Sequence, residues 1–160
     1  MPTLRYALPE DAALITAHRH SMFADNSFTS EEALAAADAK FEPWVRERLQ
    51  DGRYTGLFLE GEGSVVAGAG IFFADFPPHW MDPQPLRAYV LNVYTAPEHR
   101  GKGYARQLMQ AVIEECKQRR VPTVVLHASP FGRPVYEKLG FHPTDEMMLR
   151  LDALSLFNLE

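Results

Sequence analysis

The amino-acid sequence predicts an α+β fold, in which helices flank a mixed, mostly antiparallel sheet. Segments with the apolar alternation of strands are interspersed with segments whose apolar residues recur at helical spacing. The sequence Gly61-Glu62-Gly63 joins two strand candidates as a hairpin, which makes them antiparallel. A long amphipathic helix over residues 105–119 links two further strands, and a crossover of this kind makes them parallel. At 160 residues we expect one domain, spanning residues 1–160.

The N-terminal third predicts one strand and two helices. Residues 3–8 alternate in the manner of a short strand. A helix is expected over residues 9–23, because it opens on a proline followed by two acids, which suit the first helical turn. A second helix is expected to begin after Ser30, a good N-cap, and to reach residue 49. Pro43 is expected to divide this helix into two segments.

The central third carries the strongest strand patterns. Two strands are expected over residues 55–60 and 64–73, and the strongest of all over residues 87–95. The connection over residues 74–85 is rich in proline and aromatic residues, so we expect it to be irregular. Loops of this length are often functional, and this one is a candidate wall of a substrate site.

The C-terminal third alternates helix and strand. The helix over residues 105–119 has one apolar face, formed by Ala105, Leu108, Met109, Val112 and Cys116. A strand over residues 123–127, a short helix over residues 134–139 and a last strand over residues 147–151 complete the expected order. Because Cys116 lies on the apolar face, we expect a core residue rather than a nucleophile.

Charge and composition exclude several classes of function. The formal net charge of −5 argues against a nucleic-acid partner. No apolar run of 18 residues is present, so we expect no membrane association through a spanning helix. A single cysteine rules out a cysteine-rich zinc site, and we expect no metal. The first residues lack the apolar stretch of a signal peptide, so we expect a cytoplasmic protein.

One segment gathers positive groups at the start of a helix. The strand that ends at Thr95 runs into a glycine-rich turn, and the first helical turn beyond it offers unpaired N–H groups that bind phosphate. Arg100, Lys102 and Arg106 add three cations. The segment is no P-loop, since Lys102 is followed by Gly103, and no dinucleotide fingerprint, since residue 106 is not glycine. A phosphate site and an ordinary solvated helix start both remain open.

Two motifs resemble those of the GNAT superfamily of N-acetyltransferases. The sequence Arg100-Gly101-Lys102-Gly103-Tyr104-Ala105 fits R-x-x-G-x-G/A, the loop that binds the pyrophosphate of acyl-CoA. Residues 126–141 form the second motif, in which a strand and a turn precede a short helix ending Tyr136-Glu137-Lys138-Leu139-Gly140-Phe141. The resemblance covers most of the chain and is strongest over residues 89–141.

The resemblance implies where acetyl-CoA lies. A V-shaped opening is implied between the strand that ends at Thr95 and the strand that ends near His127. The implied contacts are the backbone of Val93, Tyr94 and Thr95 for the pantetheine arm and the amides of Arg100, Gly101, Lys102, Gly103, Tyr104 and Ala105 for the pyrophosphate. Many members have an asparagine after the second of these strands, where this chain has Ser129. Ser129 either takes over part of that contact with CoA or caps the following turn.

The resemblance also implies a direct attack of an amine on the thioester, with Tyr136 as the general acid. Tyr136 has an alternative role as an aromatic side chain that packs the short helix onto the sheet. Because a protonated amine cannot attack, a general base is useful. Glu98 is the tentative base, and His127, Tyr89 and Asp75 are further candidates, each with an ordinary structural alternative.

The acceptor site is less defined. Asn92 stands in an apolar strand, where a polar side chain needs a partner, so it faces the acceptor or bonds a loop; Asp75 and His127 are further candidates for contacting the acceptor. We expect an N-acetyltransferase that uses acetyl-CoA on a small-molecule or protein amine, with a catalytically inactive acyl-CoA sensor as the alternative. Apolar residues at 154, 156, 157 and 159 either pack on a second subunit, forming a homodimer, or cover their own sheet.

Overall fold

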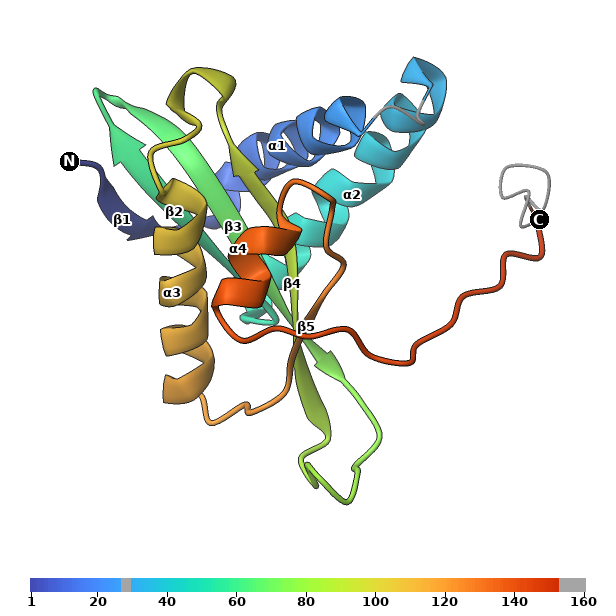
Figure 1. Ribbon diagram of the computed structural model, residues 1–160. Helices are drawn as coiled ribbons and strands as arrows, with labels where there is room; N and C mark the ends of the chain where they lie inside the picture. The colour runs from blue at the N-terminus through green and yellow to red at the C-terminus, as the bar shows by residue number, and fades with distance from the viewer. Residues whose placement is uncertain (27–29, 153–160) are drawn as a thin grey trace.

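A five-stranded sheet runs through the centre of the computed structural model, which describes residues 1–26 and 30–152 (Figure 1). The elements are β1 (Thr3–Tyr6), the 3-10 helix η1 (Pro9–Asp11), α1 (Ala12–Asp25), α2 (Glu31–Asp51), β2 (Tyr54–Gly61), β3 (Ser64–Asp75), β4 (Leu86–Thr95), the 3-10 helix η2 (Pro97–His99), α3 (Tyr104–Gln118), β5 (Val124–Leu126) and α4 (Arg133–Lys138). The strands lie in the order β1-β2-β3-β4-β5.

The sheet is mixed, as the sequence predicted. Strands β1 to β4 pair antiparallel through hairpins and the helical connection of α1 and α2. The crossover through α3 makes β4 and β5 parallel, since the chain must return along the sheet before it enters β5. The α+β class and the single parallel pair are therefore confirmed.

Helices cover both faces of the sheet (Figure 1). Helix α3 buries its predicted apolar stripe, including Cys116, against β2, β3 and β4, in a core that α4 extends. Burial raises the pKa of the Cys116 thiol to about 11, which agrees with a core role. Helices α1 and α2 form the second core with Tyr54 and Phe58 on the opposite face. The sheet thus separates two layers, and β4 has contacts with both.

The predicted break at Pro43 is wrong. Helix α2 continues through this residue from Glu31 to Asp51. Proline costs a helix interior about 3 kcal/mol because one N–H bond is lost. Leu34 and Val45, on either side of the proline, are both buried, while Pro43 itself is exposed. Packing of the two ends therefore outweighs the local cost.

The predicted last strand over residues 147–151 is also wrong. This segment has no regular structure, and Met147, Met148, Leu149 and Leu151 are 69–93% exposed. In Figure 1 the chain leaves α4 and runs away from the sheet. An alternating sequence forms a strand only where a neighbouring strand accepts its hydrogen bonds, and no described strand pairs with this one. The apolar residues at 154, 156, 157 and 159 lie outside the described residues.

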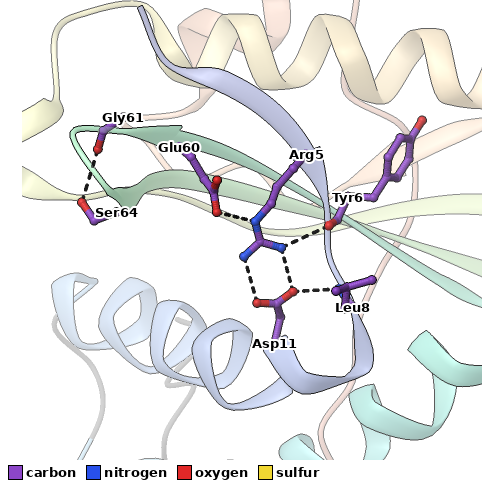
Figure 2. A network of polar contacts seen from close by, with 7 residues as sticks. All are labelled: Arg5, Tyr6, Leu8, Asp11, Glu60, Gly61 and Ser64. Atoms are coloured by element: carbon purple, nitrogen blue, oxygen red, sulfur yellow. Dashed lines mark hydrogen bonds and ion pairs between the residues drawn. The ribbon is translucent and has the colours of Figure 1, made fainter.

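A polar network fastens the start of α1 to the sheet (Figure 2). The guanidinium of Arg5 on β1 donates from Nη1 and Nη2 to the two carboxylate oxygens of Asp11, at 2.8 and 3.0 Å, and from Nε to Glu60 on β2. The N–H of Leu8 donates to Asp11 at 2.7 Å. The hydrogen bonds from Arg5 hold the pKa of Asp11 below its usual range. The network matters for the site because α1 carries residues that lie over β4.

Candidate active site

Strand β4 contains a bulge at the centre of the sheet. Gly70 pairs with Leu91, but the next pair along joins Gly68 to Tyr94, so β4 has one residue more than β3 over this stretch. Asn92 takes up the irregularity with a φ of +60°. A bulge of this kind changes the side-chain alternation, so Leu91 and Asn92 both face the layer of α1 and α2.

Asn92 links three elements of the fold. Its Nδ2 donates to the Tyr54 hydroxyl at 2.9 Å, and its Oδ1 accepts from Arg19 Nη1 at 2.9 Å. The side chain is 3% exposed, so these bonds satisfy a buried amide. Gly70 makes the arrangement possible, because a Cβ there would lie 1.9 Å from the Tyr54 oxygen. The structure therefore joins Asn92 to β2 and α1, not to a loop.

Strands β4 and β5 separate soon after they pair. Their ladder comprises three residue pairs, from Ala88–Val124 to Val90–Leu126. Beyond Val90, the edge of β4 that faces β5 has no strand partner among the described residues. Val93, Tyr94 and Thr95 lie along this open edge. The family resemblance implies that the pantetheine arm contacts these three residues, which stays a prediction.

The glycine-rich turn leaves a run of backbone N–H groups unpaired. Gly101 and Gly103 have φ of +77° and +81°, which a side chain would strain, and a Cβ at either position would point into open space. Within residues 1–26 and 30–152, the N–H groups of residues 101–106 donate to no acceptor. Together with the dipole of the fifteen-residue α3, this turn has the features of an anion site.

The three cations near this turn have different surroundings. Arg100 donates to the Thr95 carbonyl at 3.0 Å and to Asp25 on α1 at 2.9 Å, so its charge is already paired. Lys102 Nζ lies 3.4 Å from His99 Nδ1. Arg106 is exposed and has no ion-pair partner among the described residues. Lys102 and Arg106 are therefore the available positive groups.

Tyr136 lies in the core with its hydroxyl free. It is 9% exposed and packs edge-on against Phe141 at a centroid distance of 6.0 Å. Gly132 makes room for the ring, since a Cβ there would lie 2.8 Å from it. No described residue forms a hydrogen bond with the Tyr136 hydroxyl, and burial raises the pKa of this group. Ser129 caps the preceding turn, with its Oγ accepting the Gly132 N–H at 3.2 Å.

A pocket of about 250 Å³ opens on the α1 and α2 side of β4. It is lined by Arg19, Phe41, Trp44, Phe72, Tyr89 and Leu91. Tyr89 reaches across to the end of β5, where its hydroxyl lies 2.5 Å from Nδ1 of His127. Burial raises the pKa of Tyr89, while His127 is exposed to solvent. The pair therefore connects the pocket with water.

Two predicted site residues lie apart from this pocket. Glu98 is exposed on η2 and has no hydrogen bond to another described residue. Asp75 is exposed at the end of β3, in register with Leu86. The connection between β3 and β4 is held elsewhere, because Asp82 accepts from Thr123 Oγ1 at 2.6 Å at the start of β5. No residue of this connection lines the pocket.

Sequence reasoning missed two residues of α1. Arg19 falls on the buried stripe that begins with Ala12 and Ile15, and a cation on an apolar stripe is the signal that would have identified it. His18 lies beside Tyr94 at a centroid distance of 5.1 Å, and burial lowers its pKa.

The described residues lack two other kinds of feature. They contain no cluster of three or more His, Cys, Asp or Glu able to hold a metal ion. They also contain no helix that is both long and apolar enough to cross a membrane.

The sequence model of the Acetyltransferase (GNAT) family matches residues 17–141, which include β4, the glycine-rich turn, α3 and Tyr136. The chain belongs to this family. A GCN5-related N-acetyltransferase from Ralstonia eutropha JMP134 is similar to this acetyltransferase, with 35% identity and a TM-score of 0.90 over 94% of this chain and 99% of its own. The fold, including the parallel β4–β5 pair, is therefore that of the family.

Two further solved structures resemble this acetyltransferase. A predicted acetyltransferase with acetyl-CoA from Clostridium acetobutylicum has 30% identity and a TM-score of 0.86, over 97% of this chain and 98% of its own. The glucosamine-6-phosphate N-acetyltransferase of Arabidopsis thaliana shares the fold, with 15% identity and a TM-score of 0.67 over 95% of this chain and 99% of its own. No curated protein matches the sequence.

Proposed function

We propose that this acetyltransferase moves an acetyl group from acetyl-CoA to a primary amine by direct attack in a ternary complex. The observation that carries the proposal is the continuous path from the open edge of β4 to the free N–H groups of residues 101–106. The path pairs a backbone edge, suited to the amides of a pantetheine arm, with an anion site, suited to a pyrophosphate. The alternative is a sensor that binds acyl-CoA without turnover.

The chain offers a matching group for each part of acetyl-CoA. The backbone of Val93, Tyr94 and Thr95 would hold the pantetheine arm. The pyrophosphate would bind the amides of residues 101–105, with Lys102 and Arg106 supplying positive charge. The Arg100 side chain supports the turn through Thr95 and Asp25. The Ser129 hydroxyl is engaged in its own turn, and a contact with CoA stays a prediction.

Acetyl transfer requires two proton transfers in addition to forming the bond from nitrogen to carbon and breaking the bond from carbon to sulfur. The amine nitrogen forms a bond to the acetyl carbon, and the bond between that carbon and sulfur breaks. Negative charge develops on the acetyl oxygen, where an N–H of Val93 or Tyr94 would stabilise it. The leaving CoA thiolate takes a proton from the Tyr136 hydroxyl, whose raised pKa keeps it protonated at neutral pH.

The second transfer removes a proton from the amine. An amine with a pKa near 10 loses about 4 kcal/mol in becoming neutral at pH 7. Tyr89 lines the pocket, and its hydroxyl is within hydrogen-bond distance of His127. We assign the removal to this pair: the amine proton passes to the Tyr89 oxygen while the Tyr89 proton passes to His127 Nδ1. Glu98 stays the competing prediction.

The experiment is to measure CoA thiol release from acetyl-CoA across a panel of primary amines, with acetyl-CoA binding measured separately by calorimetry. We expect binding together with amine-dependent release. Binding without release on any amine would favour the sensor. An absence of binding would remove the proposed function altogether.

Two broader expectations accompany the proposal. We propose a homodimer formed through residues 147–151, because Met147, Met148, Leu149 and Leu151 are exposed on a segment that pairs with no described strand. Light scattering should give twice the mass of one chain, and Leu149→Glu should reduce it to one. Trp80→Glu, at an exposed residue of the β3–β4 connection, is the control and should leave the dimer intact. A cytoplasmic location is also proposed, since the single cysteine of the chain is buried in the core and needs no oxidising compartment.

A further inference from the structure

We propose that Arg19 binds a carboxylate on the acceptor, so that the acceptor is a small amine with an apolar body and a negatively charged group. This inference rests on the proposed function, because that function is the reason to place the acceptor in the pocket. It adds the substrate class, which the family and the similar structures leave open.

The guanidinium of Arg19 is held in a fixed position at the pocket. It stacks on two aromatic rings, lying 4.6 Å from the centroid of Phe23 and 4.7 Å from that of Phe41. Nη1 donates to Asn92 Oδ1 at 2.9 Å. A guanidinium has five N–H donors, so most of them remain for a ligand. An ordered arginine loses less freedom on binding than a flexible surface side chain does.

The charge of Arg19 has no ion-pair partner within residues 1–26 and 30–152. Burial lowers the pKa of Arg19, and the electrostatic influence of Tyr54, Tyr89 and Asp38 opposes the effect without forming an ion pair. The Asp38 carboxylate is itself engaged by His20 Nδ1 at 2.6 Å. Arg5, another partly buried arginine, differs because it pairs with Asp11 at 2.8 Å. A partly buried cation without a counter-ion is costly, and an anionic ligand would offset that cost.

The other lining residues define the rest of the ligand. Phe41, Trp44, Phe72 and Leu91 are apolar, and a volume of about 250 Å³ suits a molecule of amino-acid size. Tyr89 lines the same pocket as Arg19, so a carboxylate on Arg19 would direct the amine toward the Tyr89–His127 pair. A planar carboxylate also fits the paired N–H groups of a guanidinium better than a neutral group does.

A ligand without an amine isolates this site from the chemistry. We would measure by calorimetry the binding of 3-phenylpropionate and of 3-phenylpropan-1-ol to the wild type, Arg19→Gln and Arg46→Gln. Arg46 is the matched control, since it lies on α2 in the same layer but pairs with Glu42 at 3.9 Å and does not line the pocket. We expect the carboxylate to bind at least tenfold more tightly than the alcohol, a preference that Arg19→Gln abolishes and Arg46→Gln keeps. Equal binding of the two compounds, or a preference that survives Arg19→Gln, would overturn the proposal.

Arg19 also supports Asn92, so loss of fold must be separated from loss of the ligand. Arg19→Lys keeps the charge without the planar donors and should retain part of the preference. Unchanged acetyl-CoA affinity and thermal unfolding in both variants would exclude a general collapse. If Arg19→Gln unfolds, the test rests on Arg19→Lys. If Arg19→Lys keeps the full preference for 3-phenylpropionate over 3-phenylpropan-1-ol, recognition by the planar guanidinium is contradicted.

Turnover then separates the sources of negative charge. The substrates are L-phenylalanine, phenethylamine and 1-amino-2-phenylethylphosphonic acid. We expect the highest kcat/KM for the carboxylate and a selective loss of at least tenfold for it in Arg19→Gln. Preference for phenethylamine would refute the anionic class, and preference for the phosphonate would refute the carboxylate. If no amine is acetylated, the proposed function fails, whereas the binding of 3-phenylpropionate still tests Arg19.

Discussion

The Tyr89 hydroxyl and Nδ1 of His127 lie 2.5 Å apart, next to the last residue pair that joins β4 to β5. One side chain lines the pocket and the other is exposed. The contact therefore provides a short path for a proton between the pocket and bulk water.

Tyr89→Phe and His127→Gln should each lower kcat at pH 7 by about 100-fold, the usual scale of general base catalysis. In the proposed relay the two groups act together, so the double variant should lose little more than either single variant. The measurement is kcat against pH, where the loss should diminish as the free amine becomes abundant. Glu98→Gln is the control; a larger loss in that variant would transfer the base role to Glu98.

Tyr136→Phe should lower kcat by about 100-fold while leaving the Kd of acetyl-CoA unchanged, because the role proposed for the hydroxyl is to protonate the leaving thiolate. Burial raises the pKa of Tyr136 above its ordinary value, so the phenol stays protonated at neutral and mildly alkaline pH and the wild type should show no loss of the acid there. Saturating kinetics from pH 6 to 10 provide the measurement. Equal turnover in the two proteins would leave Tyr136 with a packing role only.

Gly103→Asp should weaken acetyl-CoA binding by about 10- to 100-fold, because it adds negative charge beside the free N–H groups that start α3. Gly52→Asp is the matched control. Gly52 has nearly the same φ, +82° against +81°, and the same open space around a Cβ, but it lies at the end of α2. Calorimetry should show normal affinity for that control. Equal weakening in both variants would attribute the effect to backbone strain.

Asp11→Asn should lower the free energy of unfolding at pH 7 by about 1 kcal/mol, since it removes the charge from a partly buried, two-point contact with Arg5. The lowered pKa of Asp11 means that its contribution is complete above about pH 4 and is lost as the pH falls through that lowered value. Urea unfolding at pH 7 and pH 3 should therefore show a difference between variant and wild type that shrinks in acid. Asp51→Asn, at an exposed carboxylate paired with Arg53, should have little effect at either pH. A difference that persists at pH 3 would contradict the assignment.

Local patterns in the sequence were sufficient for most of the fold. The stripe along α3, the turn at 61–63 and the glycines at 101 and 103 each reflect constraints that act within a few residues. Pro43 was misjudged because burial of Leu34 and Val45 is a tertiary effect that outweighs a local cost. The strand over 147–151 was misjudged because a ladder needs a partner, which no local pattern reveals.

The part of the candidate site that the backbone forms could be predicted from the sequence. The part where side chains from distant elements meet could not. The free N–H groups of residues 101–106 follow from one contiguous motif. The pocket brings together Arg19 of α1, Trp44 of α2 and Tyr89 of β4, which only the packing of two helices on the sheet makes neighbours. Asn92 was recognisable as a polar residue in an apolar strand, but its partners depend on the bulge in β4.

The three-pair ladder between β4 and β5 leaves the sheet incomplete where the chemistry would occur. A polypeptide strand at that place would satisfy the edge of β4 permanently and fill the opening. Acetyl-CoA, with its two amides, would act instead as a removable sixth strand, present only while the reaction proceeds. Without its cosubstrate the protein has an unpaired edge on β4. Each catalytic cycle would pair that edge with acetyl-CoA and free it again when CoA leaves.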